Sequence, residues 1–170
     1  ATSTNNFTTA TFIAANATVL DGDAISVGGS NVTNNLTVTA GGDITQAGLT
    51  VGNVGTFNTP TANVVLSDPT NDLTNVVVNA VNATIVDGSG FNFDTSTLTG
   101  TLTATATTGN VGINNGQTVS VQGGSITATT GAFATAAGST LNTGGAAFTV
   151  NANMMTLGGT SITGTSALTL

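Results

Sequence analysis

A seven-residue motif that occurs twice is the feature that most constrains the fold of this chain. Residues 16–22 have the sequence Asn-Ala-Thr-Val-Leu-Asp-Gly, and residues 82–88, which lie 66 positions later, have the sequence Asn-Ala-Thr-Ile-Val-Asp-Gly. Further matches follow at a growing spacing, so that residues 78–80 match residues 150–152 at a spacing of 72. A repeat whose spacing tolerates small insertions is typical of stacked coils joined by turns of variable length.

The composition favours β-strands over helices. The chain has 38 Thr, 20 Asn and 23 Gly and no Glu, and Gly or Asn interrupts every window long enough for a helix. Apolar residues alternate with Thr, Ser or Asn in short runs such as Leu36-Thr37-Val38-Thr39, and the runs end at Gly, Asn or Asp. This alternation predicts strands with one face turned inward, whose starts recur about every seven residues.

Three such strands per coil predict an all-β fold, a right-handed parallel β-helix (β-solenoid) of about eight coils of roughly 20–22 residues each. We expect residues 1–170 to form a single β-solenoid domain with an internal super-repeat of about 66–72 residues, in which one super-repeat makes three coils. Asn and Thr at equivalent positions are expected to stack into ladders. A sandwich or barrel of short antiparallel strands is the competing prediction, which the self-similarity disfavours.

The absence of several residue types argues against several classes of function. The chain has no Lys, Arg, His, Cys, Trp or Tyr, and its seven acidic residues, all Asp, lie between Asp21 and Asp94. Nucleic acids and anionic membranes are bound through cationic side chains, so we expect neither as a partner. Disulfides and zinc sites need Cys or His. No apolar run approaches the roughly 18 residues of a transmembrane helix, and no signal-peptide pattern is visible.

Two stretches of the sequence resemble a known family of repeats. Residues 41–52 read Gly-Gly-Asp-Ile-Thr-Gln-Ala-Gly-Leu-Thr-Val-Gly, and residues 62–85 include Ala-Asn-Val-Val-Leu, Asn-Asp-Leu and Asn-Ala-Thr-Ile. They resemble the degenerate repeats of filamentous-haemagglutinin-like exoproteins, the large bacterial adhesins of two-partner secretion and autotransporter systems. The resemblance covers residues 15–130 and, more loosely, the rest of the chain. The chain departs from the family in lacking Lys and Arg and a recognisable secretion domain.

This resemblance implies a right-handed parallel β-helix that is secreted across the outer membrane and stays extracellular at the cell surface. It also implies a role as a shaft or contact surface, and the family repeats carry no catalytic residues to transfer. We therefore expect an extracellular structural protein and not an enzyme: an adhesin-like shaft or a self-stacking subunit of a bacterial surface filament. End-to-end self-association is the expected partnership, with a host surface or a carbohydrate as a further candidate ligand.

Aspartates in turns are the candidate site residues. Asp21 with Asp23, and Asp68 with Asp72, form two pairs of carboxylates, and paired carboxylates cleave glycosidic bonds in many enzymes. The alternative function is accordingly a carbohydrate-binding or polysaccharide-cleaving β-helix. Asp-Gly and Asp-Pro are also ordinary turn formers, which is the simpler interpretation. Asp21, Asp23, Asp68 and Asp72 are candidate calcium ligands as well, since calcium prefers oxygen donors, although no known calcium-loop motif matches and no cofactor is required by the sequence.

Threonine pairs suggest a second alternative, an ice-binding solenoid. Thr37/Thr39, Thr103/Thr105/Thr107 and Thr127/Thr129 have the Thr-x-Thr spacing that places the side chains on one face of a strand. A flat ladder of such pairs holds ordered water in some ice-binding proteins, and it requires one pair per coil in register. A whole super-repeat separates the first two pairs, so we expect the intermediate coils to lack them. The sequence therefore favours ordinary outward-facing Thr.

Overall fold

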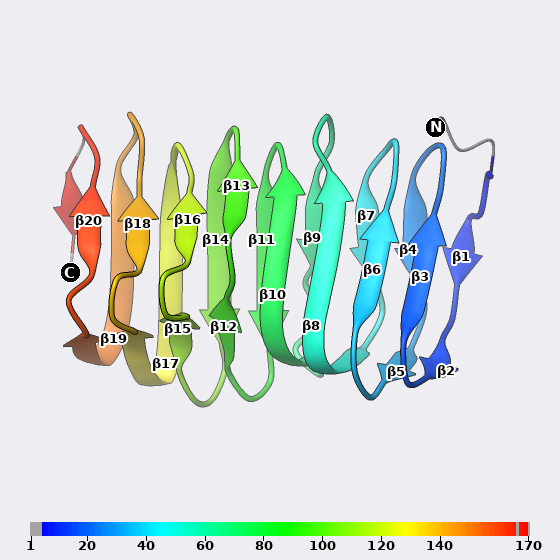
Figure 1. The fold of residues 1–170 in the computed structure, drawn as a ribbon, viewed down its shortest axis with the longest axis horizontal. Helices are drawn as coiled ribbons and strands as arrows, with labels where there is room; N and C mark the ends of the chain where they lie inside the picture. Colours follow the sequence, from blue (N-terminus) through cyan, green and yellow to red (C-terminus); the bar gives the residue numbers. More distant parts are fainter. Residues whose placement is uncertain (1–4, 166, 170) are drawn as a thin grey trace.

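The computed structural model describes residues 5–165 and 167–169, which wind into a right-handed β-solenoid with no helix among these residues. In Figure 1 the chain rises on the near side, descends on the far side and advances from right to left, which is a right-handed turn. All described strand pairs are parallel and connect strands from successive coils into one sheet of 21 strands. The predicted right-handed parallel β-solenoid of about eight coils is confirmed.

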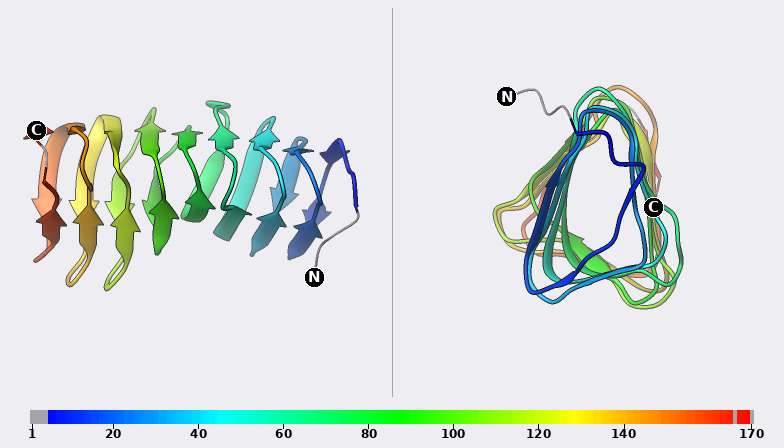
Figure 2. Two further views of the ribbon diagram at one scale, coloured as in Figure 1. Left: turned by 90° about the horizontal axis from the view of Figure 1, so that it is seen from above. Right: turned by 90° about the vertical axis from the view of Figure 1, so that its right-hand side faces the viewer.

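Each coil has three sides, which give the solenoid a three-sided outline when it is viewed along its axis (Figure 2). We call them side 1, side 2 and side 3 in chain order. Four long strands bend around a corner and contribute to two sides: β8 (Leu49–Thr59) and β10 (Asp72–Ala80) to sides 2 and 3, and β17 (Gly123–Thr135) and β19 (Phe148–Leu157) to sides 1 and 2.

The remaining strands each lie on one side. Side 1 contains β1 (Thr9–Ala10), β4 (Ile25–Val27), β7 (Ile44–Gln46), β9 (Val64–Leu66), β11 (Ala83–Asp87), β14 (Thr101–Ala106) and β21 (Leu168–Thr169). Side 2 contains β2 (Ile13–Ala14), β5 (Ser30–Val32), β12 (Phe91–Phe93) and β15 (Val111–Ile113). Side 3 contains β3 (Ala17–Leu20), β6 (Leu36–Thr39), β13 (Ser96–Leu98), β16 (Thr118–Ser120), β18 (Thr140–Asn142) and β20 (Ser161–Thr163).

The interior is one continuous cluster of apolar side chains that extends from Val19 to Val150. The alternation in each strand turns every second side chain inward, so that like residues stack on like residues in successive coils. On side 1, Ile25 pairs with Ile44, and Ile44 pairs with Val64. Because each coil buries its apolar side chains mainly against its neighbours, stability accumulates along the stack.

Coil length varies more than the sequence predicts. Thr9 in the first coil pairs with Ser26, whereas Gly124 in a late coil pairs with Phe148, so the late coil is clearly the longer of the two. The register shifts within two of the long strands, between Leu73 and Asn75 in β10 and between Ala128 and Ala132 in β17, and the turns at the corners also vary in length. This variability explains why the repeat spacing drifts along the chain.

The two copies of the seven-residue motif do not lie on the same side of the solenoid. Ala17 pairs with Leu36 on side 3, whereas Ala83 pairs with Val64 and Leu102 on side 1. The 66 residues between the two copies therefore make three coils plus one further side. The expectation that this spacing corresponds to three whole coils was wrong. The motif encodes a strand followed by a corner, a unit that fits more than one position of a three-sided coil.

Candidate functional site

The structure separates the four predicted calcium ligands into two places. Asp21 and Asp23 lie at a corner between sides 3 and 1, and Asp68 and Asp72 lie near a corner between sides 1 and 2, in a later coil. The described residues contain no group of three or more acidic side chains positioned to hold a metal ion. Calcium binding stays a prediction.

Asp21 and Asp23 do not face a common site. Asp21 is buried, and its carboxylate accepts the backbone N–H of Phe7 in the preceding coil at 3.1 and 3.3 Å. Asp23 is exposed. Since one carboxylate faces the interior and the other faces solvent, the pair lacks the shared opening that a glycosidase needs for its substrate.

Asp68 stabilises its own turn. Its Oδ1 accepts hydrogen bonds from the backbone N–H of Thr70 at 2.9 Å and from the Thr70 hydroxyl at 2.7 Å. These two bonds, first the backbone N–H and then the hydroxyl, hold the pKa of Asp68 below its ordinary value. Such an arrangement is an ordinary Asx turn, which the sequence Asp-Pro-Thr predicts.

The most heavily hydrogen-bonded carboxylate belongs to Asp87, which is fully buried. Its Oδ2 accepts the backbone N–H of Leu73 at 2.7 Å, and its Oδ1 accepts the backbone N–H groups of Ser89 at 2.9 Å and Gly90 at 2.6 Å. The Ser89 hydroxyl lies 3.1 Å from this Oδ1 and 3.0 Å from Oδ1 of Asp72. Backbone N–H groups thus stabilise a buried charge in a chain that has no Lys, Arg or His.

Asp21 and Asp87 perform the same task at different corners. Each is the sixth residue of the repeated motif, and each accepts the N–H of a residue 14 positions earlier in the preceding coil. The sequence predicts an ordinary turn at Asp21-Gly22 and at Asp87-Gly88 and does not reveal that both carboxylates are buried. The signal that identifies them is their recurrence at the same position of the repeated motif.

Two ladders of polar side chains connect successive coils at two of the three corners. Between sides 2 and 3, side-chain contacts link Asn16, Asn35, Asn53, Asn75, Asp94 and Asn114. Between sides 3 and 1, they link Asp43, Asn63, Asn82 and Thr101. These bonds satisfy backbone and amide groups at the strand ends, where the sheet ladders stop. The expected stacking of Asn and Thr is therefore present at the corners.

Side 3 has an uncharged polar surface that repeats from coil to coil, and we call it the side-3 array. Its first column is Thr18, Thr37, Thr56 and Val77, continued in later coils by Thr118, Thr140 and Ser161. Its second column is Leu20, Thr39, Asn58, Asn79, Thr97, Ser120, Asn142 and Thr163. The strands that carry it form the near row in Figure 1.

This array changes the interpretation of the Thr-x-Thr pairs. Thr37/Thr39 belongs to side 3, whereas Thr103 and Thr105 lie on side 1, so the two pairs do not form one column. Thr103 pairs with Ser125 and Thr105 with Thr127, so Thr127 continues the column of Thr105 on side 1. The next two coils of side 3 carry Thr56-x-Asn58 and Val77-x-Asn79 in place of a Thr-x-Thr pair, as the sequence predicts.

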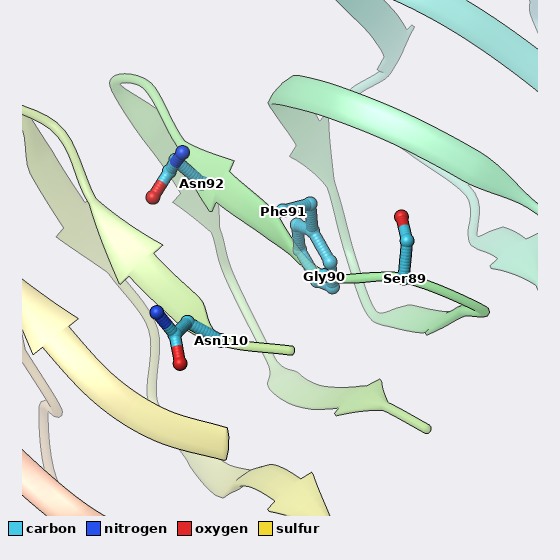
Figure 3. Close-up of a pocket in the computed structure, with 5 residues that line it drawn as sticks. All are labelled: Ser89, Gly90, Phe91, Asn92 and Asn110. Carbon is cyan, nitrogen blue, oxygen red and sulfur yellow. The ribbon is translucent and has the colours of Figure 1, made fainter. Parts of the chain in front are cut away.

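A shallow pocket of about 270 Å³ lies at the corner between sides 1 and 2, and is lined by Ser89, Gly90, Phe91, Asn92 and Asn110 (Figure 3). None of these lining residues is titratable near neutral pH, so they offer no general acid or base. Asn110 is also committed to the fold, since its Oδ1 accepts the backbone N–H of Ala132 at 2.8 Å. The pocket therefore offers hydrogen bonds to a small ligand but no catalytic group.

Comparison with known proteins adds one finding about the repeats. A family model described as repeats of unknown function (DUF5649) matches residues 14–80. The matched residues extend from the end of β2 in the first coil to the end of β10 in the fourth and include the first copy of the motif. No curated protein and no solved structure matches the chain. The described residues also contain no helix that is long and apolar enough to span a membrane.

Proposed function

We propose that this chain is an extracellular structural protein, an adhesin-like β-solenoid shaft or a self-stacking subunit of a bacterial surface filament. The observation that carries the proposal is the continuous parallel pairing on all three sides, over about eight coils, around one unbroken core. A body of this kind resists bending and shear, because neighbouring coils are joined by backbone hydrogen bonds on every side. The resemblance to filamentous-haemagglutinin-like repeats supports the extracellular location.

The distribution of exposed apolar side chains supports end-to-end association. Among the described residues, the large apolar side chains that are exposed are Phe7, Ile13 and Leu20 in the first coil and Met154 and Leu157 in the last. The described coils between them expose no other large apolar side chain to this extent. Ile13 and Leu20 face outward from sides 2 and 3, in register with Asn31 and Thr39. Met154 and Leu157 instead occupy the positions that buried Ala132 and Thr135 hold in the coil before, so a further coil, whether from a second copy or from a longer chain, would cover them and pair with the open strand edges.

Sedimentation velocity of the 170-residue chain over a range of concentrations tests this association. We expect assemblies that grow with concentration, and we expect the Leu157→Asp variant to reduce their growth because it places a charge in the proposed contact. Thr103→Asp is the matched control, since it adds the same charge at an exposed position of a middle coil. A monomer at all concentrations would refute self-stacking and would leave the shaft as the proposed role.

The proposed function requires no catalysis and no cofactor. Asp21 and Asp87 direct their oxygens at backbone N–H groups, and such oxygens would have to give up these bonds to bind calcium. We therefore expect the melting temperature to be the same in calcium and in EDTA. A melting temperature that rises with calcium would instead support Asp21, Asp23, Asp68 and Asp72 as ligands, since binding to the folded state stabilises it.

A further inference from the structure

The chain contains one Asp-Pro bond, between Asp68 and Pro69, and it lies in a turn. The turn joins β9 to β10 at the corner between sides 1 and 2, and Pro69 and Thr70 are exposed in it. A prolyl nitrogen carries no hydrogen, so it donates no hydrogen bond that would hold it in the sheet. It is also more basic than the nitrogen of an ordinary peptide bond, which makes it a better leaving group once it is protonated.

The carboxylate of Asp68 is held close to this bond. Its Oδ1 accepts hydrogen bonds from the backbone N–H of Thr70 at 2.9 Å and from the Thr70 hydroxyl at 2.7 Å. The ring that the first of these bonds closes contains the carbonyl carbon of Asp68 and the nitrogen of Pro69. A carboxylate that is restrained in this way loses little further entropy when it attacks its own carbonyl carbon, a step that closes a five-membered ring.

The carbonyl group of Asp68 is polarised by a fixed donor. Its oxygen accepts the backbone N–H of Asn71 at 3.2 Å. Asn71 is itself buried and immobilised, since its Oδ1 accepts the N–H of Leu49 at 2.9 Å and its Nδ2 donates to the carbonyl oxygen of Val86 at 2.8 Å. A donor of this kind stabilises the negative charge that develops on a carbonyl oxygen during nucleophilic attack. The turn therefore brings together a nucleophile, a polarised carbonyl group and a basic leaving group.

We propose that the chain cleaves its own Asp68-Pro69 bond in mild acid. A carboxylate oxygen of Asp68 attacks the carbonyl carbon of the same residue and forms a C–O bond. The C–N bond to Pro69 then breaks, and its electron pair takes up a proton from the solvent at the prolyl nitrogen. A cyclic anhydride of Asp68 remains, and one water molecule hydrolyses it to two carboxyl groups.

The surroundings of Asp68 favour this reaction in acid, because the attack needs an ionised carboxylate and the leaving nitrogen needs a proton. Hydrogen bonds from Thr70, first the backbone N–H and then the hydroxyl, hold the pKa of Asp68 below its ordinary value. The other titratable groups at this corner are Asp72, which accepts the Ser89 hydroxyl, and Asp87, which accepts backbone N–H groups. The chain has no Lys, Arg or His. The rate should therefore rise as the pH falls toward the folded-state pKa of Asp68.

Cleavage would cut the fourth coil without separating the two pieces. β9 pairs with β11, and β10 pairs with β8, so each piece stays paired with the other in the sheet. We expect the two pieces to co-elute in gel filtration at neutral pH and to separate in urea. The reaction is compatible with the proposed structural role and does not depend on it.

Intact-mass spectrometry of the 170-residue chain tests the proposal, during incubation at the lowest pH at which circular dichroism shows the full fold. We expect two products, residues 1–68 and residues 69–170, whose masses add up to the mass of the chain plus one water molecule. We expect the folded chain to be cleaved at least about tenfold faster than the chain unfolded in urea at the same pH, because the turn fixes the reacting groups.

Two variants remove one reacting group each. Asp68→Glu keeps the charge but makes the five-membered ring impossible, and Pro69→Ala removes the basic leaving group, so we expect neither variant to be cleaved at this bond. Asp23→Glu is the matched control, because it makes the same change at an exposed Asp of another turn, and it should be cleaved at the unmodified rate. Circular dichroism verifies the fold of all three variants.

An unmodified chain that stays intact, or that is cut only at other bonds, would refute the proposal. Equal rates in the folded and unfolded chain would also overturn it, because the bond would then break by the ordinary acid lability of Asp-Pro, without a contribution from the turn. This comparison uses the unmodified chain alone and decides the question even if a variant fails to fold.

Discussion

Individual side chains stabilise this solenoid most visibly where they satisfy backbone groups at the corners. Asp87 is the clearest example, since its buried carboxylate accepts the N–H groups of Leu73, Ser89 and Gly90. A carboxylate provides acceptors only, and this suits a corner at which several N–H groups converge. Charge is thus buried in the absence of any cationic side chain because the backbone itself supplies the positive dipoles.

Asp87→Asn is expected to destabilise the chain. The substitution replaces one acceptor oxygen by an NH₂ donor that would oppose an N–H group, so at least one buried donor loses its partner. We expect a loss of about 1–3 kcal/mol in the free energy of unfolding, measured by urea denaturation. Asp23→Asn is the matched control, since Asp23 is exposed, and it should change the stability by less than about 0.5 kcal/mol. Equal stability of the two variants would contradict the role assigned to Asp87.

Gln46→Leu is expected to stabilise the chain. Both polar atoms of the Gln46 side-chain amide are buried without a hydrogen-bond partner, and Gln46 pairs with Val27 at an inward position of side 1. Removing an unsatisfied buried amide should raise the free energy of unfolding by about 1–2 kcal/mol in urea denaturation. Gln117→Leu is the control that should not stabilise, because Gln117 accepts hydrogen bonds from Thr95. A loss of stability in Gln46→Leu would show that the amide is satisfied in solution.

The pKa of Asp68 should lie below 3.8, its ordinary value, because Thr70 donates two hydrogen bonds to the charged carboxylate. A lowered folded-state pKa means that these bonds favour folding above the unfolded-state pKa. Their contribution is then lost as the pH falls through the lower, folded-state pKa. An NMR titration of the Asp68 carboxyl carbon measures this value, and Thr70→Val should raise it toward 3.8. Thr70→Val keeps the backbone N–H, so an unchanged midpoint would contradict only the share assigned to the Thr70 hydroxyl.

The strand followed by its corner is the element from which the solenoid is built. Its strand is well determined by sequence, since alternation such as Leu36-Thr37-Val38-Thr39 predicts β6 and the direction of its side chains. The corners depend on close contacts between turns of adjacent coils, which a single sequence does not reveal. The variation in coil length therefore could not be predicted, and neither could the side on which each motif copy lies.

Two glycines allow the energetic cost of an unfavourable backbone conformation to be separated from the cost of a steric clash between coils. Gly109 and Gly116 have similar φ values of +73° and +67°. A Cβ atom at position 109 would collide with the carbonyl oxygen of Ser89 in the preceding coil, whereas one at position 116 has no atom within 4 Å.

Gly116→Ala should lower the free energy of unfolding by about 1–2 kcal/mol, the conformational cost of the left-handed region for Ala. Gly109→Ala should cost at least about 1 kcal/mol more, because it also forces adjacent coils apart. Thermal or urea unfolding of both variants measures the difference. Equal losses would contradict the close approach of the two coils at this corner.

The molecule as a whole is a stack of coils, and each of its three sides carries equivalent positions from one coil to the next. This repetition links its architecture to the proposed structural role. The sequence was sufficient to predict the β-solenoid and its number of coils, since the composition, the alternation and the drifting repeat all agree. It was insufficient for the side-3 array, because Thr, Asn, Ser and Val share that surface and only their register shows that they are equivalent. Buried Asp21 and Asp87 were missed since Asp-Gly is usually an exposed turn.

Negative-stain electron microscopy of the chain in its native preparation tests the central claim most directly, which is that the chain is a rigid stacked shaft. About eight coils at about 4.8 Å each make a rod about 38 Å long. We predict narrow, unbranched rods of that length, or fibres with that axial repeat if the terminal coils stack on each other. Round particles without a long axis would contradict the account.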